Sequence, residues 1–278
     1  MTKSLSFLSQ SQQSIFDKLN HDTILYIIEF LNDYDKIRFT SIEKEMNLLK
    51  YHIKFYDKYE YERVKHLLFI KNFKHITYLS DNINIPNNIT HLTFDDNFNQ
   101  EIKNTIPQGV THLTFGKFFN QQIQNSIPNS VTHLILGYYF NQKIDKSIPN
   151  NVTHLTFGRF FNRGIKDCIP QSVTHLKFGY YFNQQIKDLI PNSITHLTLE
   201  HQFNLKIKNC IPNSITHLTF GYDFNQKIKN CIPNSVTHLT FGYKFNQEIK
   251  NCIPNSVTLS PKGRLENVDE TSTLLLHI

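Results

Sequence analysis

The sequence contains no tryptophan, only nine glycines and four cysteines, and no long run of apolar residues. A membrane-spanning helix needs about 20 consecutive apolar residues, so we expect no span and no membrane partner. The first ten residues also lack the apolar stretch of a secretion signal. These absences predict an intracellular protein, in the cytoplasm or the nucleus.

The sequence also lacks the residue clusters that support catalysis. It has no glycine-rich phosphate loop, and its serines, histidines and carboxylates recur at fixed intervals instead of forming an isolated set. The cysteines share one repeat position, which favours a small structural residue over a disulfide or a metal ligand. They are Cys168, Cys210, Cys231 and Cys252. We therefore expect no enzymatic activity, no cofactor and no metal.

What the sequence does contain is a 21-residue unit that recurs eight times between residues 85 and 258. The period is marked by Pro86, Pro107, Pro128, Pro149, Pro170, Pro191, Pro212, Pro233 and Pro254. A fixed period of this length is typical of a solenoid, because each unit buries its apolar face only by stacking on its neighbours.

The spacing of apolar residues within one unit predicts a strand followed by turns. Leu134 and Leu136 are two residues apart, so both face inward from a strand. The wider intervals to Phe140, Ile144 and Ile148 predict turns and loops that return the chain. The Ile-Pro step predicts a turn with proline at its second position. The repeats are thus expected to form a leucine-rich-repeat-like parallel β-solenoid.

The residues before the repeats have a helical pattern. Ile24, Ile28 and Leu31 lie on one face of a helix that Asn20 or Asp22 would cap. The fold class is therefore α+β, with a small N-terminal helical domain before a solenoid of 21-residue coils. We divide the chain into a disordered arm at 1–14, the helical domain at 15–60, a linker and degenerate coil at 61–84, the repeats at 85–258 and a C-terminal cap at 259–278. In the degenerate coil, the sequence from His75 resembles the strand that begins at His91.

Two parts of the chain resemble known families. The Phe-Asn and Ile-Pro steps of every copy, as in Phe140-Asn141 and Ile148-Pro149, resemble the FNIP repeat, a leucine-rich-repeat-like family often carried behind an F-box. The segment 19–37 resembles an F-box, although Asn20 stands where that motif has proline. An F-box implies docking on the Skp-type adaptor of a cullin–RING ubiquitin ligase. The residues that would bind the adaptor are Leu19, Ile24, Ile27, Ile28, Leu31 and Ile37.

Three columns of equivalent residues stand out in the repeats. Each unit carries an asparagine after the phenylalanine, and its amide is expected to bond loop backbone that has no sheet partner. This ladder comprises Asn99, Asn120, Asn141, Asn162, Asn183, Asn204, Asn225 and Asn246. A histidine opens every predicted strand and faces outward. The two positions after the glycine vary most between copies, which favours a recognition role; the alternative is that their aromatic members cover the rim of the core.

We predict that the histidine column and the variable position form a surface that binds a partner protein. Its residues are His112, His133, His154, His175, His196, His217 and His238, with Tyr138, Arg159, Tyr180, His201, Tyr222 and Tyr243. The alternative for the histidines is a plain exposed strand, without a metal because no carboxylate or cysteine accompanies them.

The charge of the chain is +6, and its excess lies in the repeats, which hold 15 basic and 9 acidic residues. A column of lysines after the repeat isoleucine supplies much of it, and a solvated edge explains that column better than nucleic acid does. The favoured function is a non-enzymatic substrate receptor of a ubiquitin ligase, which holds an unknown target protein on the solenoid. The alternatives are a scaffold whose helices only cap the array and, less favoured, a basic surface for nucleic acid or anionic lipid.

Overall fold

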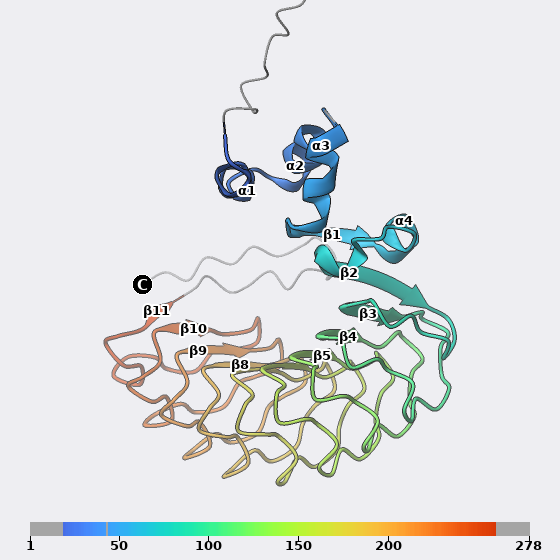
Figure 1. The fold of residues 1–278 in the computed structure, drawn as a ribbon. Helices are drawn as coiled ribbons and strands as arrows, with labels where there is room; N and C mark the ends of the chain where they lie inside the picture. Colours follow the sequence, from blue (N-terminus) through green and yellow to red (C-terminus); the bar gives the residue numbers. More distant parts are fainter. Residues whose placement is uncertain (1–18, 43, 260–278) are drawn as a thin grey trace, which may run out of the picture. The chain divides into compact units, whose positions relative to one another are not determined.

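The computed structural model describes residues 19–42 and 44–259, and the chain divides into two compact units between Ile76 and Thr77 (Figure 1). The arm expected at 1–14 and, apart from Leu259, the cap expected at 259–278 lie outside the described residues. Within the described ranges, no helix has the length and apolar content that crossing a membrane requires.

The first unit is a small helical domain that ends in a strand. It contains α1 (His21–Glu29), α2 (Asp33–Phe39), α3 (Lys44–Asn47), the 3-10 helix η2 (Leu48–Tyr51), β1 (Phe55–Glu60), α4 (Tyr61–Val64), the 3-10 helix η3 (Ile70–Asn72) and the start of β2 (Phe73–Ser80). Asn20 caps α1, because its Oδ1 accepts a hydrogen bond of 2.7 Å from the backbone N–H of Thr23. Asn20 thus defines the start of this helix.

A buried ion pair ties α2 to β1 in this unit. Asp33 and Lys36 are each 3% exposed, and their Oδ1 and Nζ atoms lie 3.4 Å apart. The other oxygen of Asp33 accepts from the backbone N–H of Asp57 at 2.7 Å and from the Tyr59 hydroxyl at 3.2 Å. Lys36 also donates to the carbonyl of Lys54 at 2.9 Å. Burial and the neighbouring Asp33 carboxylate raise the pKa of Tyr59, which therefore stays a donor.

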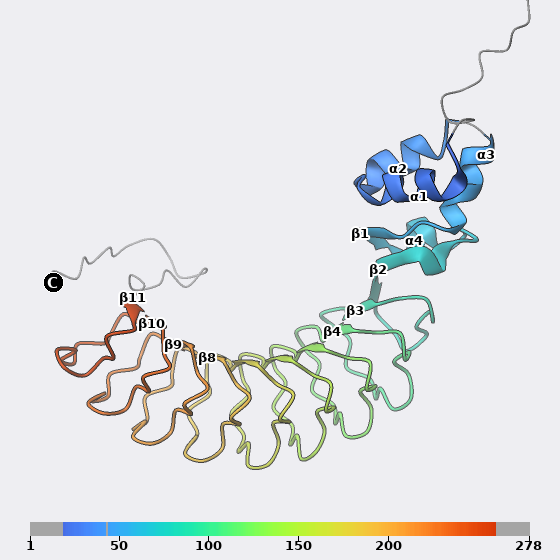
Figure 2. The ribbon, with the colours of Figure 1, turned by 60° about the vertical axis from the view of Figure 1, so that its left-hand side comes forward.

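The second unit is a parallel β-solenoid, as the repeat period predicts (Figures 1 and 2). Its strands after β2 are β3 (His91–Phe94), β4 (His112–Thr114), β5 (His133–Ile135), β6 (His154–Thr156), β7 (His175–Lys177), β8 (His196–Leu199), β9 (His217–Phe220), β10 (His238–Thr240) and β11 (Thr258–Leu259). We number the coils one to eight by the histidine that opens each strand, from His91 to His238. Equivalent residues pair, so His112 lies opposite His133.

The degenerate coil before coil one pairs in a different register from the expected one. Thr77, and not His75, lies opposite His91, and Tyr78 occupies the inward position next to Leu92. The echo of the repeat at His75 is therefore a coincidence of sequence. The parallel ladder, which aligns Tyr78 with the leucine column, sets the register instead.

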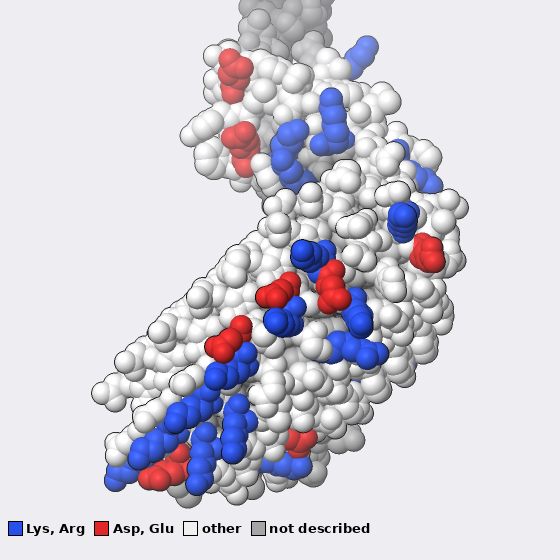
Figure 3. All heavy atoms as spheres, turned by 90° about the horizontal axis from the view of Figure 1, so that it is seen from below, with Lys and Arg blue, Asp and Glu red and all other residues white. Residues whose placement is uncertain are grey.

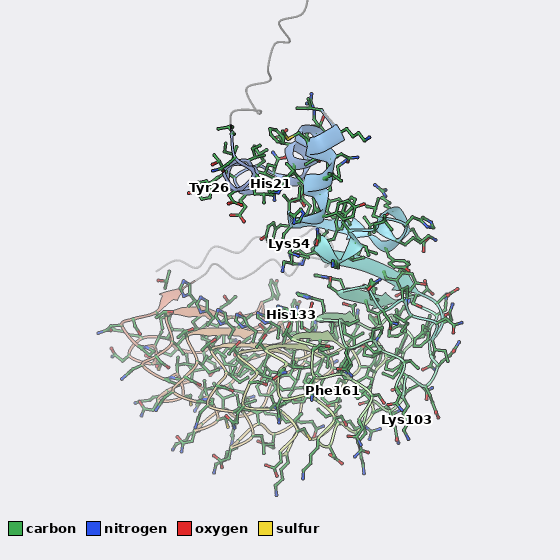
Figure 4. The ribbon with its side chains drawn as sticks, in the orientation of Figure 1. His21, Tyr26, Lys54, Lys103, His133 and Phe161 are labelled. Carbon is green, nitrogen blue, oxygen red and sulfur yellow. The ribbon has the colours of Figure 1, made fainter. Side chains whose placement is uncertain are left out.

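Coils one to seven each contribute the six buried apolar side chains that the spacing predicts, whereas Ile249 of coil eight is 37% exposed. In coil three and the turns that flank it, Val131, Leu134, Leu136, Phe140, Ile144 and Ile148 are all at most 5% exposed. The phenylalanines stack along the array, with the rings of Phe140 and Phe161 centred 6.3 Å apart. Phe161 lies inside the coils, whereas His133 lies at the strand face and Lys103 at the outer edge (Figure 4).

The turns that return the chain differ from the expected turn. The backbone N–H of Val131 bonds the carbonyl of Pro128 at 3.1 Å, so proline is the first residue of this turn and not the second. The turn just before it contains the left-handed position of the coil. All eight such residues have φ between 49° and 59°: Asn104, Asn125, Lys146, Asp167, Asp188, Asn209, Asn230 and Asn251. Asparagine and aspartate tolerate this conformation better than other residues with a side chain.

In six of the eight coils a glycine follows the strand, and close stacking of the coils requires it there. A Cβ atom on Gly158 would lie 1.7 Å from the carbonyl oxygen of Gly137, and one on Gly179 would lie 1.9 Å from that of Gly158. Among residues 19–42 and 44–259, no glycine has a positive φ. These glycines are therefore fixed by approach of the preceding coil, not by backbone conformation.

Candidate interaction surfaces

The first unit carries exposed apolar side chains on α1 and α2. Phe30 and Tyr34 are 75% and 65% exposed, and Tyr26 and Phe30 meet edge to face at 5.1 Å. Tyr26 is labelled at the surface of this unit in Figure 4. Isolated exposed apolar residues need no explanation, but a group of large ones on two consecutive helices indicates an interaction surface.

The six residues predicted to bind an adaptor divide between this surface and the core. Ile24 and Ile28 point inward and are 6% and 0% exposed, whereas Ile27 and Ile37 are exposed. The remaining two, Leu19 and Leu31, are half-buried. Ile24 and Ile28 are one helical turn apart, so both pack α1 against the core of the unit. Tyr26, Ile27 and Phe30 are exposed to solvent. The sequence pattern finds the helix but misses the aromatic members of its exposed side.

The histidines form one continuous stack along the strand face. Adjacent rings from His91 to His238 are centred 4.0 to 4.2 Å apart, with interplanar angles of 6° to 15°. In-register parallel pairing puts each ring directly on the next. The histidine column is thus a half-buried surface stripe whose ring edges, and not ring faces, meet solvent.

The threonine before each histidine fixes its tautomer. The Thr132 hydroxyl lies 3.2 Å from the carbonyl of Thr111 and 2.9 Å from Nδ1 of His133, and the other coils repeat this arrangement. A carbonyl only accepts, so the hydroxyl donates to it and accepts from Nδ1–H. Each Nε2 therefore carries a lone pair at the outer ring edge.

Stacking disfavours the charged form of these rings. Burial, and then the charge of neighbouring histidines, lowers the pKa of His133, His154, His175 and His196 below the ordinary value of 6.5. Their Nε2 lone pairs lie on parallel rings and do not converge on one point. In keeping with this, the described part of the chain holds no group of three or more His, Cys, Asp or Glu arranged for a metal.

The variable positions form a second stack, which we call the aromatic ledge. One row contains Lys117, Tyr138, Arg159, Tyr180, His201, Tyr222 and Tyr243, and the next contains Phe118, Tyr139, Phe160 and Tyr181. The guanidinium of Arg159 lies between two rings, 5.4 Å from the centre of Tyr138 and 4.1 Å from that of Tyr180. Tyr139 and Phe118 are 38% and 44% exposed, so the ledge combines aromatic edges with cationic groups.

Coils six to eight add ion pairs to this ledge. Glu200, which replaces glycine in coil six, pairs with Lys177 of the preceding strand at 2.9 Å. Asp223 pairs with Lys244 at 2.7 Å and lies 3.4 Å from Nδ1 of His201. Burial lowers the pKa of His201, and the carboxylate of Asp223 opposes that shift. The odd residues of coil six thus have partners in the coils on either side.

The asparagines bond backbone from coil to coil, and they do so at the surface. In the first seven coils, the Oδ1 of the asparagine accepts from the backbone N–H of the asparagine in the next coil at 2.9 to 3.2 Å. Gln121 adds a bond from its side chain to the carbonyl of Asn99 at 3.1 Å. The side chains are exposed or half-buried. Water therefore competes for these bonds and lowers the net stabilisation from each.

The cysteines are free thiols. Cys168, Cys210 and Cys231 are buried and Cys252 is half-buried. Burial raises the pKa of Cys168 to about 11, with Asp145 adding to the effect, and burial also raises the pKa values of Cys210 and Cys231. A thiol with a raised pKa is a poor nucleophile, which agrees with a packing role.

Comparison with known proteins identifies relatives with the same repeat. A protein provisionally named as F-box and FNIP repeat-containing protein R286 of Acanthamoeba polyphaga mimivirus is 36% identical, over 32% of this chain and 36% of its own length. A second mimivirus protein, provisionally named F-box protein L168, is 33% identical over 33% of this chain and 43% of its own length. The matches span well under half the length of either relative.

A solved structure shares the fold. The crystal structure of CroV588, described as a circular leucine-rich-repeat protein, is 43% identical with a TM-score of 0.57, over 68% of this chain and 33% of that one. The sequence model of the FNIP Repeat matches this chain eight times, first at 81–118 and last at 224–259. These matches together cover more than half of the chain, and the chain therefore belongs to the FNIP repeat family.

Proposed function

We propose that the chain is a non-enzymatic substrate receptor of a cullin–RING ubiquitin ligase. Its first unit would bind a Skp-type adaptor, and its solenoid would hold a target protein for ubiquitination in the cytoplasm or the nucleus. The observation that carries the first part is the group of exposed apolar side chains on α1 and α2, centred on Ile27 and Phe30. The F-box names of the mimivirus relatives support the same role.

Adaptor binding is tested with the full chain and a purified Skp-type adaptor. The double variant Ile27→Asp/Ile37→Asp changes two exposed residues, so the unit keeps its core. Leu68→Asp, at a site 82% exposed outside α1 and α2, is the matched control. We expect the wild type and the control to bind and the double variant to lose at least tenfold in affinity, about 1.4 kcal/mol.

Two outcomes would contradict the proposal. Absence of binding by the folded wild type would leave a scaffold whose helical unit has no adaptor. Equal loss in Leu68→Asp would mean that binding does not use α1 and α2. Circular dichroism must first show native helix content in all three proteins.

For the target, the aromatic ledge together with the histidine column is the surface we propose. Tyrosine and arginine are enriched where proteins bind one another, because they combine large contact area with a polar group. The ledge carries six tyrosines and one arginine on coils two to eight, with Tyr139 and Phe118 exposed. The variable residues also differ between coils, so the ledge presents a pattern that can distinguish one partner from another.

The target surface is tested by comparing the proteins that co-purify with each variant. Phe118→Ser/Tyr139→Ser removes two exposed rings, and Lys103→Ser changes an exposed residue at the outer edge of the same solenoid. Quantitative mass spectrometry should show proteins lost from the double variant and kept by Lys103→Ser. Identical sets from all three would contradict a target site on the ledge.

A further inference from the structure

Lysines gather at the outer edge of the last four coils. This basic edge consists of Lys187, Lys206, Lys208, Lys227, Lys229 and Lys250, all exposed. In coils six and seven the lysines lie two residues apart around Ile207 and Ile228, which are 0% and 1% exposed. The buried isoleucine turns the residues on both sides outward, so stacking of coils produces two rows of ammonium groups.

The basic edge has few compensating carboxylates. Only Asp188 and Glu248 lie on the same turns, and coils six and seven have none there. Across residues 19–42 and 44–259, no ion pair involves any of the six lysines. Seen from below, Lys and Arg side chains form rows toward the end of the array made by the last coils, and acidic and basic groups alternate nearer its middle (Figure 3).

We propose that the basic edge binds the phosphate backbone of double-stranded nucleic acid. Protein-binding surfaces are depleted in lysine and need apolar contacts at their centre, whereas nucleic-acid interfaces are polar and strongly basic. In coils six and seven the residue between the two lysines is a buried isoleucine, so this part of the edge offers charge without apolar contact.

The chemistry of the edge also selects among polyanions. Single strands bind where bases stack on aromatic side chains, and the outer turns of coils five to eight contain no aromatic residue. Lysine contacts phosphates as a point charge, and contacts to phosphate carry no sequence information. The expected mode is therefore sequence-independent contact with a duplex backbone, distinct from the aromatic ledge and from the adaptor surface.

The test is the salt dependence of duplex binding by the full chain. Binding of a fluorescein-labelled DNA duplex of about 20 base pairs is measured by anisotropy between about 30 and 200 mM salt. Six phosphate contacts predict a slope of log K against log salt near −5, from about −0.9 per contact. The variant Lys206→Gln/Lys208→Gln/Lys227→Gln/Lys229→Gln should reduce that slope to about −2.

A matched variant distinguishes binding at the basic edge from a general effect of the protein's net charge. Lys103→Gln/Lys143→Gln/Lys146→Gln/Lys166→Gln removes the same four charges from the outer edge of coils one, three and four. The proposal expects its slope to stay near that of the wild type. Circular dichroism and thermal unfolding confirm that both variants fold.

Several results would overturn the proposal. Lack of duplex binding by the wild type at the lowest salt is one, and an equal loss of slope in the two quadruple variants is another. Tighter binding of a labelled single strand, of poly-glutamate or of phosphatidylserine vesicles than of the duplex would assign the edge to that ligand instead. Adaptor binding is measured in parallel and should be unchanged in both variants, so this test is independent of the ligase role.

Discussion

Lys146 is a strained residue, because it adopts a left-handed backbone conformation that asparagine or aspartate occupies in the other coils. Its φ is 49°, and the seven equivalent residues are asparagine or aspartate. The left-handed conformation costs an ordinary residue about 1–2 kcal/mol, and short polar side chains offset part of that by local hydrogen bonds. We therefore expect Lys146→Asn to stabilise the solenoid by about 0.5–1 kcal/mol. For a unit of this size that is a rise in Tm of about 1–4 °C.

Two further variants identify the cause of this gain. Lys146→Gly also removes the steric cost but gives the unfolded chain more freedom, so it should stabilise less than asparagine. Asn125→Lys places lysine at the same position of coil two and should lower stability by a similar amount to the gain at Lys146. The expected stability changes of Lys146→Gly and Asn125→Lys both follow from the left-handed backbone conformation at this position.

The assay is urea unfolding followed by far-ultraviolet circular dichroism, with Lys143→Asn as the control. Lys143 is an exposed lysine of the same coil without a positive φ, and its replacement makes the same change of charge. An equal gain in Lys143→Asn would show that electrostatics and not backbone strain is responsible. No gain in Lys146→Asn would refute the reasoning outright.

Three other perturbations have expected outcomes of different kinds. Gly158→Ala should destabilise the array by more than 1 kcal/mol in thermal unfolding, because its Cβ would lie 1.7 Å from the Gly137 carbonyl oxygen. The control Gly164→Ala has nothing within 4 Å of the added carbon and should be neutral or stabilising. Asp33→Ala leaves the Lys36 ammonium buried without its partner and should cost the first unit about 3–5 kcal/mol in urea unfolding; a loss below 1 kcal/mol would contradict a desolvated pair. The pKa values of His133, His154, His175, His196 and His217 are lowered below 6.5 in the folded chain. The unfolded chain therefore binds more protons, and stability that is complete above pH ~7 should fall as the pH drops through the folded pKa values. Urea midpoints that do not change between pH 7.5 and 5 would contradict this.

The periodic part of the fold could be predicted from sequence because period and apolar spacing act on every coil alike. Leu134 and Leu136 two residues apart give a strand with its inner face, and the repeat of 21 gives stacking in parallel. The left-handed position could also have been found, since Asn or Asp stands there in seven of the eight coils, three residues before the proline. The predicted turn at the Ile-Pro step is displaced by one residue from the observed one. Both Ile-Pro-x-x and Pro-x-x-Val satisfy turn preferences, and only the hydrogen bond from Val131 to Pro128 shows that the second segment forms the turn.

Less of the candidate sites could be predicted, because side-chain direction on a short helix depends on what it packs against. The apolar residues of α1 number more than its core needs, so sequence could not tell that Ile28 is buried while Phe30 is exposed. Strand β1 was missed for a related reason. Its charged, tyrosine-rich residues resemble a linker, and it is held by Asp33, whose partner Asp57 is 24 residues away.

In a solenoid of fixed period, equivalent residues of successive coils lie next to each other. Such a column does not destabilise the fold only if identical side chains can contact one another favourably. Asparagines satisfy this by accepting and donating along the ladder, and neutral histidines do so by stacking. Where charge enters the strand face it alternates, as Lys177 pairs with Glu200 and Asp223 with Lys244. The basic edge of coils six and seven has no such alternation, although acidic residues stand at these turns elsewhere in the array. Its ammonium groups repel one another in the free protein, and an anionic ligand that spans several coils would relieve that repulsion.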